Sequence, residues 1–174
     1  MELKKLIFAT MLAAISVIIN VLFKTLIQTD TIGTAYYAIP IIIACLFLDL
    51  KYSVLVALAS DIVGVILSPF PFYFFFTFGS LMWGIIPSLL KGRKHNLFKL
   101  IVIVFITHLF ATTINSFAIA FHITKSYKAM LVDLPIRLAL VIPNTLIIAF
   151  LTEAVSEAIK LKDSFLHEGV NEWL

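Results

Sequence analysis

Three polar side chains that could bind a ligand lie inside strongly apolar segments: Arg137, Asp61 and Asn115. A charge held at the centre of a bilayer costs about 2.5–3.5 kcal/mol on insertion scales, so such residues usually serve a purpose. The guanidinium of Arg137 presents a planar fork that suits a carboxylate or the edge of a polar ring. Asp61 could receive paired donors from a heteroaromatic ring, and we take all three residues as candidate ligand contacts.

Each of these residues also has a structural interpretation. Asp133 stands four residues before Arg137, on the same face of a helix, and could pair with it. Asp61 could accept hydrogen bonds from a donor on a neighbouring helix. Asn115 could bridge two helices, as polar side chains often do inside membranes.

Two further patterns have two interpretations each. Residues 69–76 read Pro-Phe-Pro-Phe-Tyr-Phe-Phe-Phe, which is either an aromatic belt at the membrane interface or a stacking surface for a flat ligand. Ala9 and Ala13 stand four residues apart, and small residues at this spacing let another helix approach closely. That helix could belong to a partner protein or to the same bundle.

No pattern in the chain predicts catalysis. We find no His-Glu-x-x-His, paired-carboxylate or glycine-rich phosphate motif, and no nucleophile elbow. The single cysteine, Cys45, excludes an intrachain disulfide and a cysteine metal cluster. His108 is expected to be satisfied by a neighbour, and His122 to be solvated at the edge of a loop. The sequence therefore predicts neither an enzyme nor a metal or cofactor site.

The composition predicts an integral membrane protein. Of 174 residues, 61% are hydrophobic and only 13% are Asp, Glu, Lys or Arg, whereas a soluble domain carries roughly 25% charged residues. We expect a single domain over residues 1–174, with no room for a fused ATPase domain. The basic residues lie between apolar segments, so the net charge of +3 indicates orientation in a lipid membrane and not nucleic-acid binding.

Six apolar segments predict an all-α bundle of six transmembrane helices, since spanning takes roughly 20 residues. The predicted helices cover residues 4–27, 36–48, 52–67, 73–90, 97–121 and 130–161. The first is longer than the apolar part of a signal peptide and is expected to be retained. The second and third are short, which could leave a cavity open to one face. The sixth is expected to project into water, with residues 163–174 on the surface.

The distribution of Lys and Arg predicts the orientation. Six helices place both termini on one side, which holds nine basic residues against three on the other. The nine are Lys4, Lys5, Lys51, Lys91, Arg93, Lys94, Lys99, Lys160 and Lys162, and the three are Lys24, Lys125 and Lys128. Both termini are therefore predicted to be cytoplasmic, and residues 28–35, 68–72 and 122–129 to face outward.

Over essentially its whole length, the chain resembles the substrate-binding S components of energy-coupling factor (ECF) vitamin transporters. Residues 9–13, Ala-Thr-Met-Leu-Ala, resemble the Ala-x-x-x-Ala partner surface of the family's first helix. The resemblance implies a subunit that binds its vitamin at the outward face. It also implies association, through the first three helices, with a membrane coupling protein and two cytoplasmic ATPases. Their ATP hydrolysis would topple the S component and release the vitamin inside.

Within that family the chain looks most like the folate-specific members. Residues 57–64, Ala-Leu-Ala-Ser-Asp-Ile-Val-Gly, resemble their third helix, and Asn115 and residues 134–138, Leu-Pro-Ile-Arg-Leu, resemble their fifth and sixth. The chain departs from them at 49–51 and 70–76, where folate members carry more glycine. Riboflavin, thiamin, pantothenate and biotin members share the architecture and remain alternatives.

Folate also suits the residues. Its flat pterin could stack on Phe72, Tyr73 or Phe74, and its amino-pyrimidinone edge could pair with Asp61. Its anionic glutamate tail could be attracted by Lys125 or Lys128, and Arg137 could serve either end.

Two other classes of protein remain possible at this point. One is a channel or transporter that works alone, which would more often show repeated halves. The other is a passive scaffold whose polar groups only lock the helices together.

Overall fold

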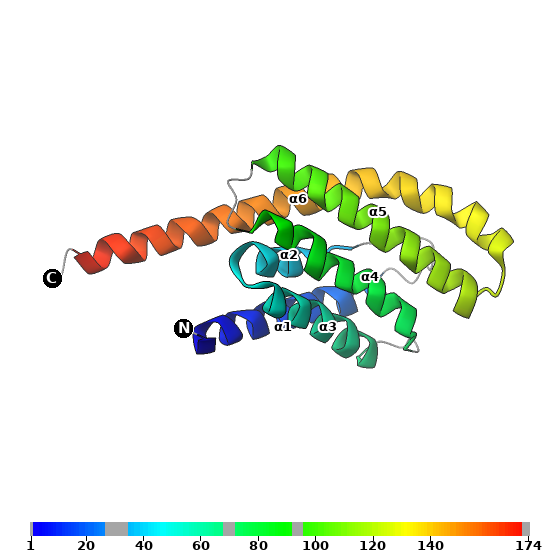
Figure 1. The fold of residues 1–174 in the computed structure, drawn as a ribbon, viewed down its shortest axis with the longest axis horizontal. Helices are drawn as coiled ribbons and strands as arrows, with labels where there is room; N and C mark the ends of the chain where they lie inside the picture. The colour runs from blue at the N-terminus through cyan, green and yellow to red at the C-terminus, as the bar shows by residue number, and fades with distance from the viewer. Residues whose placement is uncertain (1, 27–34, 68–71, 92–95, 172–174) are drawn as a thin grey trace.

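The structure is a computed structural model that describes residues 2–26, 35–67, 72–91 and 96–171, with side chains described up to residue 160 except that of Ala129. In these ranges every regular element is helical, which confirms the all-α prediction. The elements are α1 (Glu2–Leu26), α2 (Ala38–Phe47), α3 (Leu50–Ile66), α4 (Phe74–Ile85), the 3-10 helix η1 (Ile86–Leu90), α5 (Leu97–His122) and α6 (Tyr127–Asn171) (Figure 1).

Two of the predicted helices end differently in the structure. The fourth predicted helix changes to the 3-10 helix η1 after Ile85, where Pro87 lies in the first turn and lacks an N–H for the α-helical pattern. The sixth continues to Asn171, ten residues beyond the predicted end. Its last part extends away from the other helices (Figure 1). The stretch 163–171, predicted as a separate surface tail, is therefore part of the same helix.

The shortest α-helix, α2, lies at the centre of the bundle. It packs against α1, α3, α4, η1 and α6, while the longer helices also pack in the order α1, α3, α4, α5, α6. Seven of its ten residues are buried, at Ala38 and from Pro40 to Cys45. A helix that is apolar all round is expected to be buried on every side. The core of the protein is thus built around the segment 38–47.

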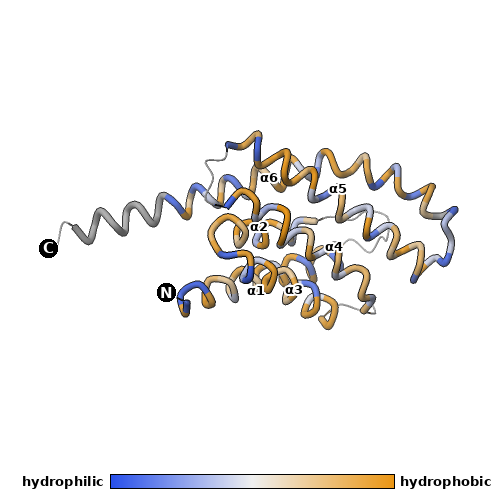
Figure 2. Tube along the Cα trace, in the orientation of Figure 1, coloured by the Kyte–Doolittle hydropathy of each residue, from blue (hydrophilic) through white to orange (hydrophobic). Residues whose placement is uncertain are grey.

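The outer surface is strongly apolar. On α1, large side chains are exposed at Ile7, Met11, Ile15, Ile18 and Leu22, opposite the face that buries Ala9, Leu12, Ser16 and Asn20. Figure 2 shows hydrophobic residues along nearly the full length of the bundle helices. Exposed apolar surface on this scale is unusual for a soluble monomer and suits contact with lipid.

Three helical stretches of the described chain have the length and hydropathy to cross a membrane: α1, α5 and residues Met130–Lys160 of α6. Residues Ala38–Phe47 and Phe74–Leu90 are apolar but shorter. The six-span topology stays a prediction.

The two ends of the bundle differ in chemistry. We call proximal the end at which α1 and α3 begin and η1 ends, and distal the opposite end, at which α1, α3 and α5 end and α4 begins (Figure 1). At the proximal end, the Asp49 carboxylate accepts hydrogen bonds from Lys5, at 2.7 Å, and from Lys91. These two lysines hold the pKa of Asp49 at about 2, below its ordinary value of 3.8. The proximal ends of α1, α3 and η1 are thereby tied together.

Candidate functional site

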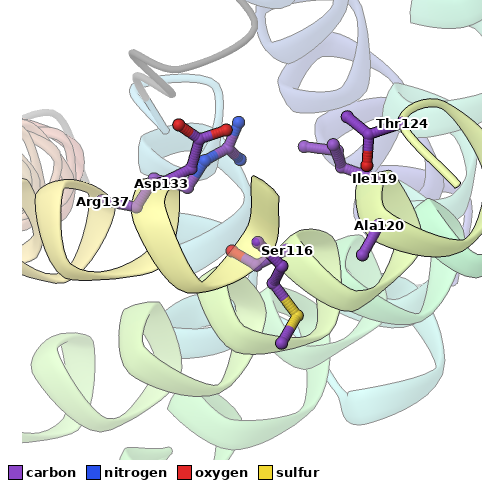
Figure 3. Close-up of a pocket in the computed structure, with 7 residues that line it drawn as sticks. Ser116, Ile119, Ala120, Thr124, Asp133 and Arg137 are labelled. Atoms are coloured by element: carbon purple, nitrogen blue, oxygen red, sulfur yellow. The ribbon is translucent and has the colours of Figure 1, made fainter. Parts of the chain in front are cut away.

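A pocket opens between α5 and α6 at the distal end (Figure 3). Its cavity volume is about 10 Å³, which is room for about one water molecule. Its lining residues are Ser116, Ile119, Ala120, Thr124, Met130, Asp133 and Arg137. Pockets that bury a whole drug-sized ligand have about 300–1,000 Å³. This pocket is far smaller than that, so a larger molecule would meet Asp133 and Arg137 at its mouth or would have to widen it.

The charged part of the pocket is the pair Asp133 and Arg137, one turn apart on α6. Their polar groups lie beside one another, as the structural interpretation of Arg137 expected (Figure 3). Both residues also line the pocket. Between them, Pro135 lacks the N–H that would otherwise bond to the carbonyl of Leu131. The pocket thus presents a cation and an anion together, an arrangement that suits a ligand edge with both donors and acceptors.

Asp61 is held by α4 in a different part of the bundle. Its side chain is buried, and its two carboxylate oxygens accept hydrogen bonds from Thr77 Oγ1 at 2.7 Å and Ser80 Oγ at 2.9 Å. A buried carboxylate needs such donors because an unpaired one is costly. Asp61 does not line the pocket, and its contacts match the structural interpretation: it joins α3 to α4.

Asn115 lies against α4 in a contact that only glycine allows. A Cβ added to Gly79 would stand 2.3 Å from Asn115 Oδ1. The same arrangement joins α1 to α3, where a Cβ on Gly64 would stand 2.6 Å from Asn20 Nδ2. Asn115 Oδ1 is buried and has no hydrogen-bond partner among the described residues. Asn115 does not line the pocket but lies next to Ser116, which does.

Of the predicted stacking residues, Tyr73 is in a compact group of rings, the distal aromatic cluster: Tyr73, Phe75, Phe121 and His122. The rings of Tyr73 and His122 are stacked with centroids 5.1 Å apart and an interplanar angle of 22°. Phe75 and Phe121 lie 5.2 and 5.1 Å from the same imidazole.

The other predicted stacking residues are more exposed. Phe72 and Phe74 are both exposed, and Phe74 contacts Phe78 edge-on, as in an interfacial belt. Residues 69–71 of the aromatic segment lie outside the described residues. The expectation that His122 is solvated holds only in part, since the residue is half-buried and its Nε2 is fully buried.

Lys125 and Lys128 are exposed at the distal end. Lys125 follows the pocket residue Thr124 and has a left-handed backbone, with φ of 49°. Lys125 therefore stands on the segment that joins the two helices of the pocket, and Lys128 stands in the first turn of α6.

On α1, Ala9 is buried in the core and Ala13 packs against the core. Their contacts match the interpretation in which this small-residue face serves the bundle itself. The predicted partner surface is thus not an exposed face of α1 in this structure.

Sequence reasoning missed two features. Ser116 and Ala120 line the pocket on α5, and their four-residue spacing is the same small-residue pattern as that of Ala9 and Ala13. The second is a buried polar group deeper in the bundle, where Tyr36 donates to Asn144 Oδ1 over 3.1 Å. The expectation that a neighbour satisfies His108 is confirmed, because its Nδ1 lies 3.4 Å from Thr145 Oγ1.

The comparisons with known proteins place the chain in a family. The family model described as "ECF transporter, substrate-specific component" matches residues 4–159. No curated protein and no solved structure matches the chain. The matched range includes at least part of every helix and all the lining residues of the distal pocket. The chain therefore belongs to the family of substrate-specific components of ECF transporters.

Proposed function

We propose that this protein is the S component of an ECF importer for folate, and that it captures the vitamin at the distal end of its bundle. Its family consists of membrane-embedded, vitamin-binding transport subunits that work with an ECF module and are not enzymes. The observation that carries the proposal is the distal pocket, where Asp133 and Arg137 stand together on a helix within the family match.

The proposed orientation has the proximal end and both termini in the cytoplasm of a multi-pass cell-membrane protein. The excess of Lys and Arg at and beyond the proximal end supports it. The distal pocket then faces outward, where an importer must meet its substrate. The proposed partners are a transmembrane coupling protein and two ATPase subunits, which supply the ATP hydrolysis that this chain does not perform.

Folate is the proposed vitamin because the distal charges suit it. The glutamate tail of folate carries carboxylates, and a guanidinium binds a carboxylate through two parallel hydrogen bonds. Exposed Lys125 and Lys128 would raise the local concentration of such an anion and speed its association. The pairing of the pterin edge with Asp61, which its chemistry suggested, would have to reach a buried carboxylate that already accepts from Thr77 and Ser80. We assign Asp61 instead to the support of α4.

The proposal is tested by identifying the small molecule that the purified chain retains. Mass spectrometry should find a folate, and calorimetric titration should give tighter binding for folate than for riboflavin, thiamin, pantothenate or biotin. Retention of a different vitamin would contradict the choice of folate. Uptake into liposomes by the chain alone would contradict the S-component mechanism and favour a stand-alone transporter.

A matched pair of charge variants tests the pocket. Arg137→Ala should weaken folate binding about ten- to hundredfold, because it removes a charge-assisted hydrogen bond in a partly buried site. Lys128→Ala removes an exposed charge of the same sign and should change the affinity by less than about threefold. Equal affinities for wild type and Arg137→Ala would exclude this pocket.

A further inference from the structure

One face of α5 carries polar residues at intervals of seven. His108, Asn115 and His122 share this face because seven residues make nearly two helical turns. All three contact α4: the ring of His108 lies 5.3 Å from that of Trp83, Asn115 lies against Gly79, and His122 stacks on Tyr73. We refer to these three residues as the α5 polar stripe.

The α5 polar stripe is less satisfied toward the distal end. His108, the deepest member, has Thr145 within 3.4 Å. The Oδ1 of Asn115 and the Nε2 of His122 are both buried, and neither has a hydrogen-bond partner among the described residues. Buried polar atoms without partners are rare in native proteins, because each carries a desolvation penalty that no bond offsets. A partner that arrives with a ligand would remove this penalty. Of the three residues, His122 lies nearest the distal end of α5.

The surroundings of His122 indicate the chemistry of that ligand. Tyr73 stacks on the imidazole, Phe75 lies tilted beside it, and Phe121 meets it in a T-shaped contact, so apolar planar rings surround it on several sides. Aromatic side chains of this kind stack with flat rings. A neutral imidazole nitrogen either accepts one hydrogen bond or donates one. Together these groups suit a planar nitrogen heterocycle that stacks on the rings and pairs one edge atom with Nε2.

We propose that His122 is a ligand-binding residue, and that the heterocyclic ring of the vitamin occupies the distal aromatic cluster with its edge hydrogen-bonded to His122 Nε2. This inference rests on the proposed function and adds an orientation to it: the ring lies on the α4 side of α5, and the anionic tail lies at Arg137 on the α6 side. A helix with its side chains is about 10–12 Å wide. A ligand that reaches both sides must therefore be an extended molecule, as folate is.

The test separates the two ends of the ligand. Pterin supplies the ring alone, aminobenzoylglutamate supplies the tail alone, and each is titrated into the purified full chain by calorimetry. His122→Phe keeps an aromatic ring beside Tyr73 but removes the nitrogen. It should weaken folate and pterin binding about tenfold and leave aminobenzoylglutamate binding within twofold of wild type. Arg137→Ala should instead weaken aminobenzoylglutamate binding and leave pterin binding within twofold of wild type.

Two further variants complete the design. His122→Gln restores a hydrogen-bonding group and should recover part of the lost pterin affinity, which a purely structural role would not predict. Thr113→Val, on the same helix, removes a hydroxyl bonded to its own backbone at Leu109 and should leave all affinities unchanged.

The outcomes distinguish this inference from the proposed function. Pterin binding within twofold of wild type in both His122 variants would overturn the role of His122 and leave folate capture intact. Wild-type protein that binds neither folate nor its fragments would overturn the proposed function and this inference with it.

Discussion

At the scale of single residues, the glycines of α4 show how the bundle admits polar side chains. Gly79 and Gly84 lie on the same short helix, yet a Cβ at each would meet different atoms. At Gly79 it would meet the end of the Asn115 side chain, which can rotate away. At Gly84 it would stand 2.9 Å from the backbone oxygen of Ser53, which cannot move without α3.

The two glycine-to-alanine variants should therefore differ in stability. Gly79→Ala should leave the free energy of unfolding unchanged or raise it, since alanine is favoured over glycine in a helix by about 1 kcal/mol. Gly84→Ala should lower it by about 1–3 kcal/mol, the usual cost of overpacking. Thermal unfolding in detergent measures both, and equal melting temperatures would contradict the packing described for α3 and α4.

Asp61 gives a second prediction at this scale. Asp61→Asn replaces a charged acceptor of two hydroxyl hydrogen bonds with a neutral amide, so it should lower the free energy of unfolding by about 1–3 kcal/mol. Folate affinity should stay within about threefold of wild type, because Asp61 does not line the pocket. A large loss of affinity at unchanged stability would instead support direct ligand contact by Asp61.

At the scale of elements, hydropathy predicts that helices form but not where each one lies. The segment 38–47 and the segment 97–122 both read as apolar, although α2 is buried on all sides and α5 exposes Phe110, Phe117 and Phe121. Lipid and protein core favour the same side chains, so composition cannot separate a central helix from a peripheral one. The change to η1 at Pro87 was readable in principle, because proline disfavours a continuous helix.

The candidate site, like the fold, could be predicted from the sequence only in part. Arg137 and Asp133 stand out as charges in an apolar helix, and both line the pocket. The roles of Gly79 and His122 depend on which face of α5 meets α4, and that pairing is a property of the folded bundle. The sequence therefore indicated the charged half of the site and, through Tyr73, part of the aromatic half, but not His122.

The ion pairs of the proximal end make a prediction about pH. The pKa of Asp49 is lowered from 3.8 to about 2 by Lys5 and Lys91, so its contribution to stability is complete above about pH 4 and disappears as the pH falls to 2. Wild type should therefore melt at a higher temperature than Asp49→Asn from pH 5 to 8, and the difference should vanish between pH 4 and 2. A difference that persists at pH 2 would show that Asp49 acts through something other than its charge.

At the scale of the whole molecule, the proposed function depends on which end of the bundle faces outward. The distal end holds the pocket, the aromatic cluster and the exposed Lys125, while the proximal end holds the ion pairs around Asp49. A vitamin importer captures its substrate outside, whereas the coupling ATPases consume ATP inside. The orientation can be measured directly because the single cysteine, Cys45, is buried in the core and can be replaced by alanine.

In that Cys45→Ala background, Lys125→Cys and Lys160→Cys place one thiol at the distal end and one on the part of α6 that projects beyond the proximal end. Both positions are exposed, so both thiols can react. In intact cells a membrane-impermeant maleimide should label Lys125→Cys and leave Lys160→Cys unlabelled until the membrane is permeabilised. The reverse pattern would place the pocket in the cytoplasm, where it could not collect a vitamin from outside. Labelling of both variants in intact cells would mean that α6 does not cross the membrane between them.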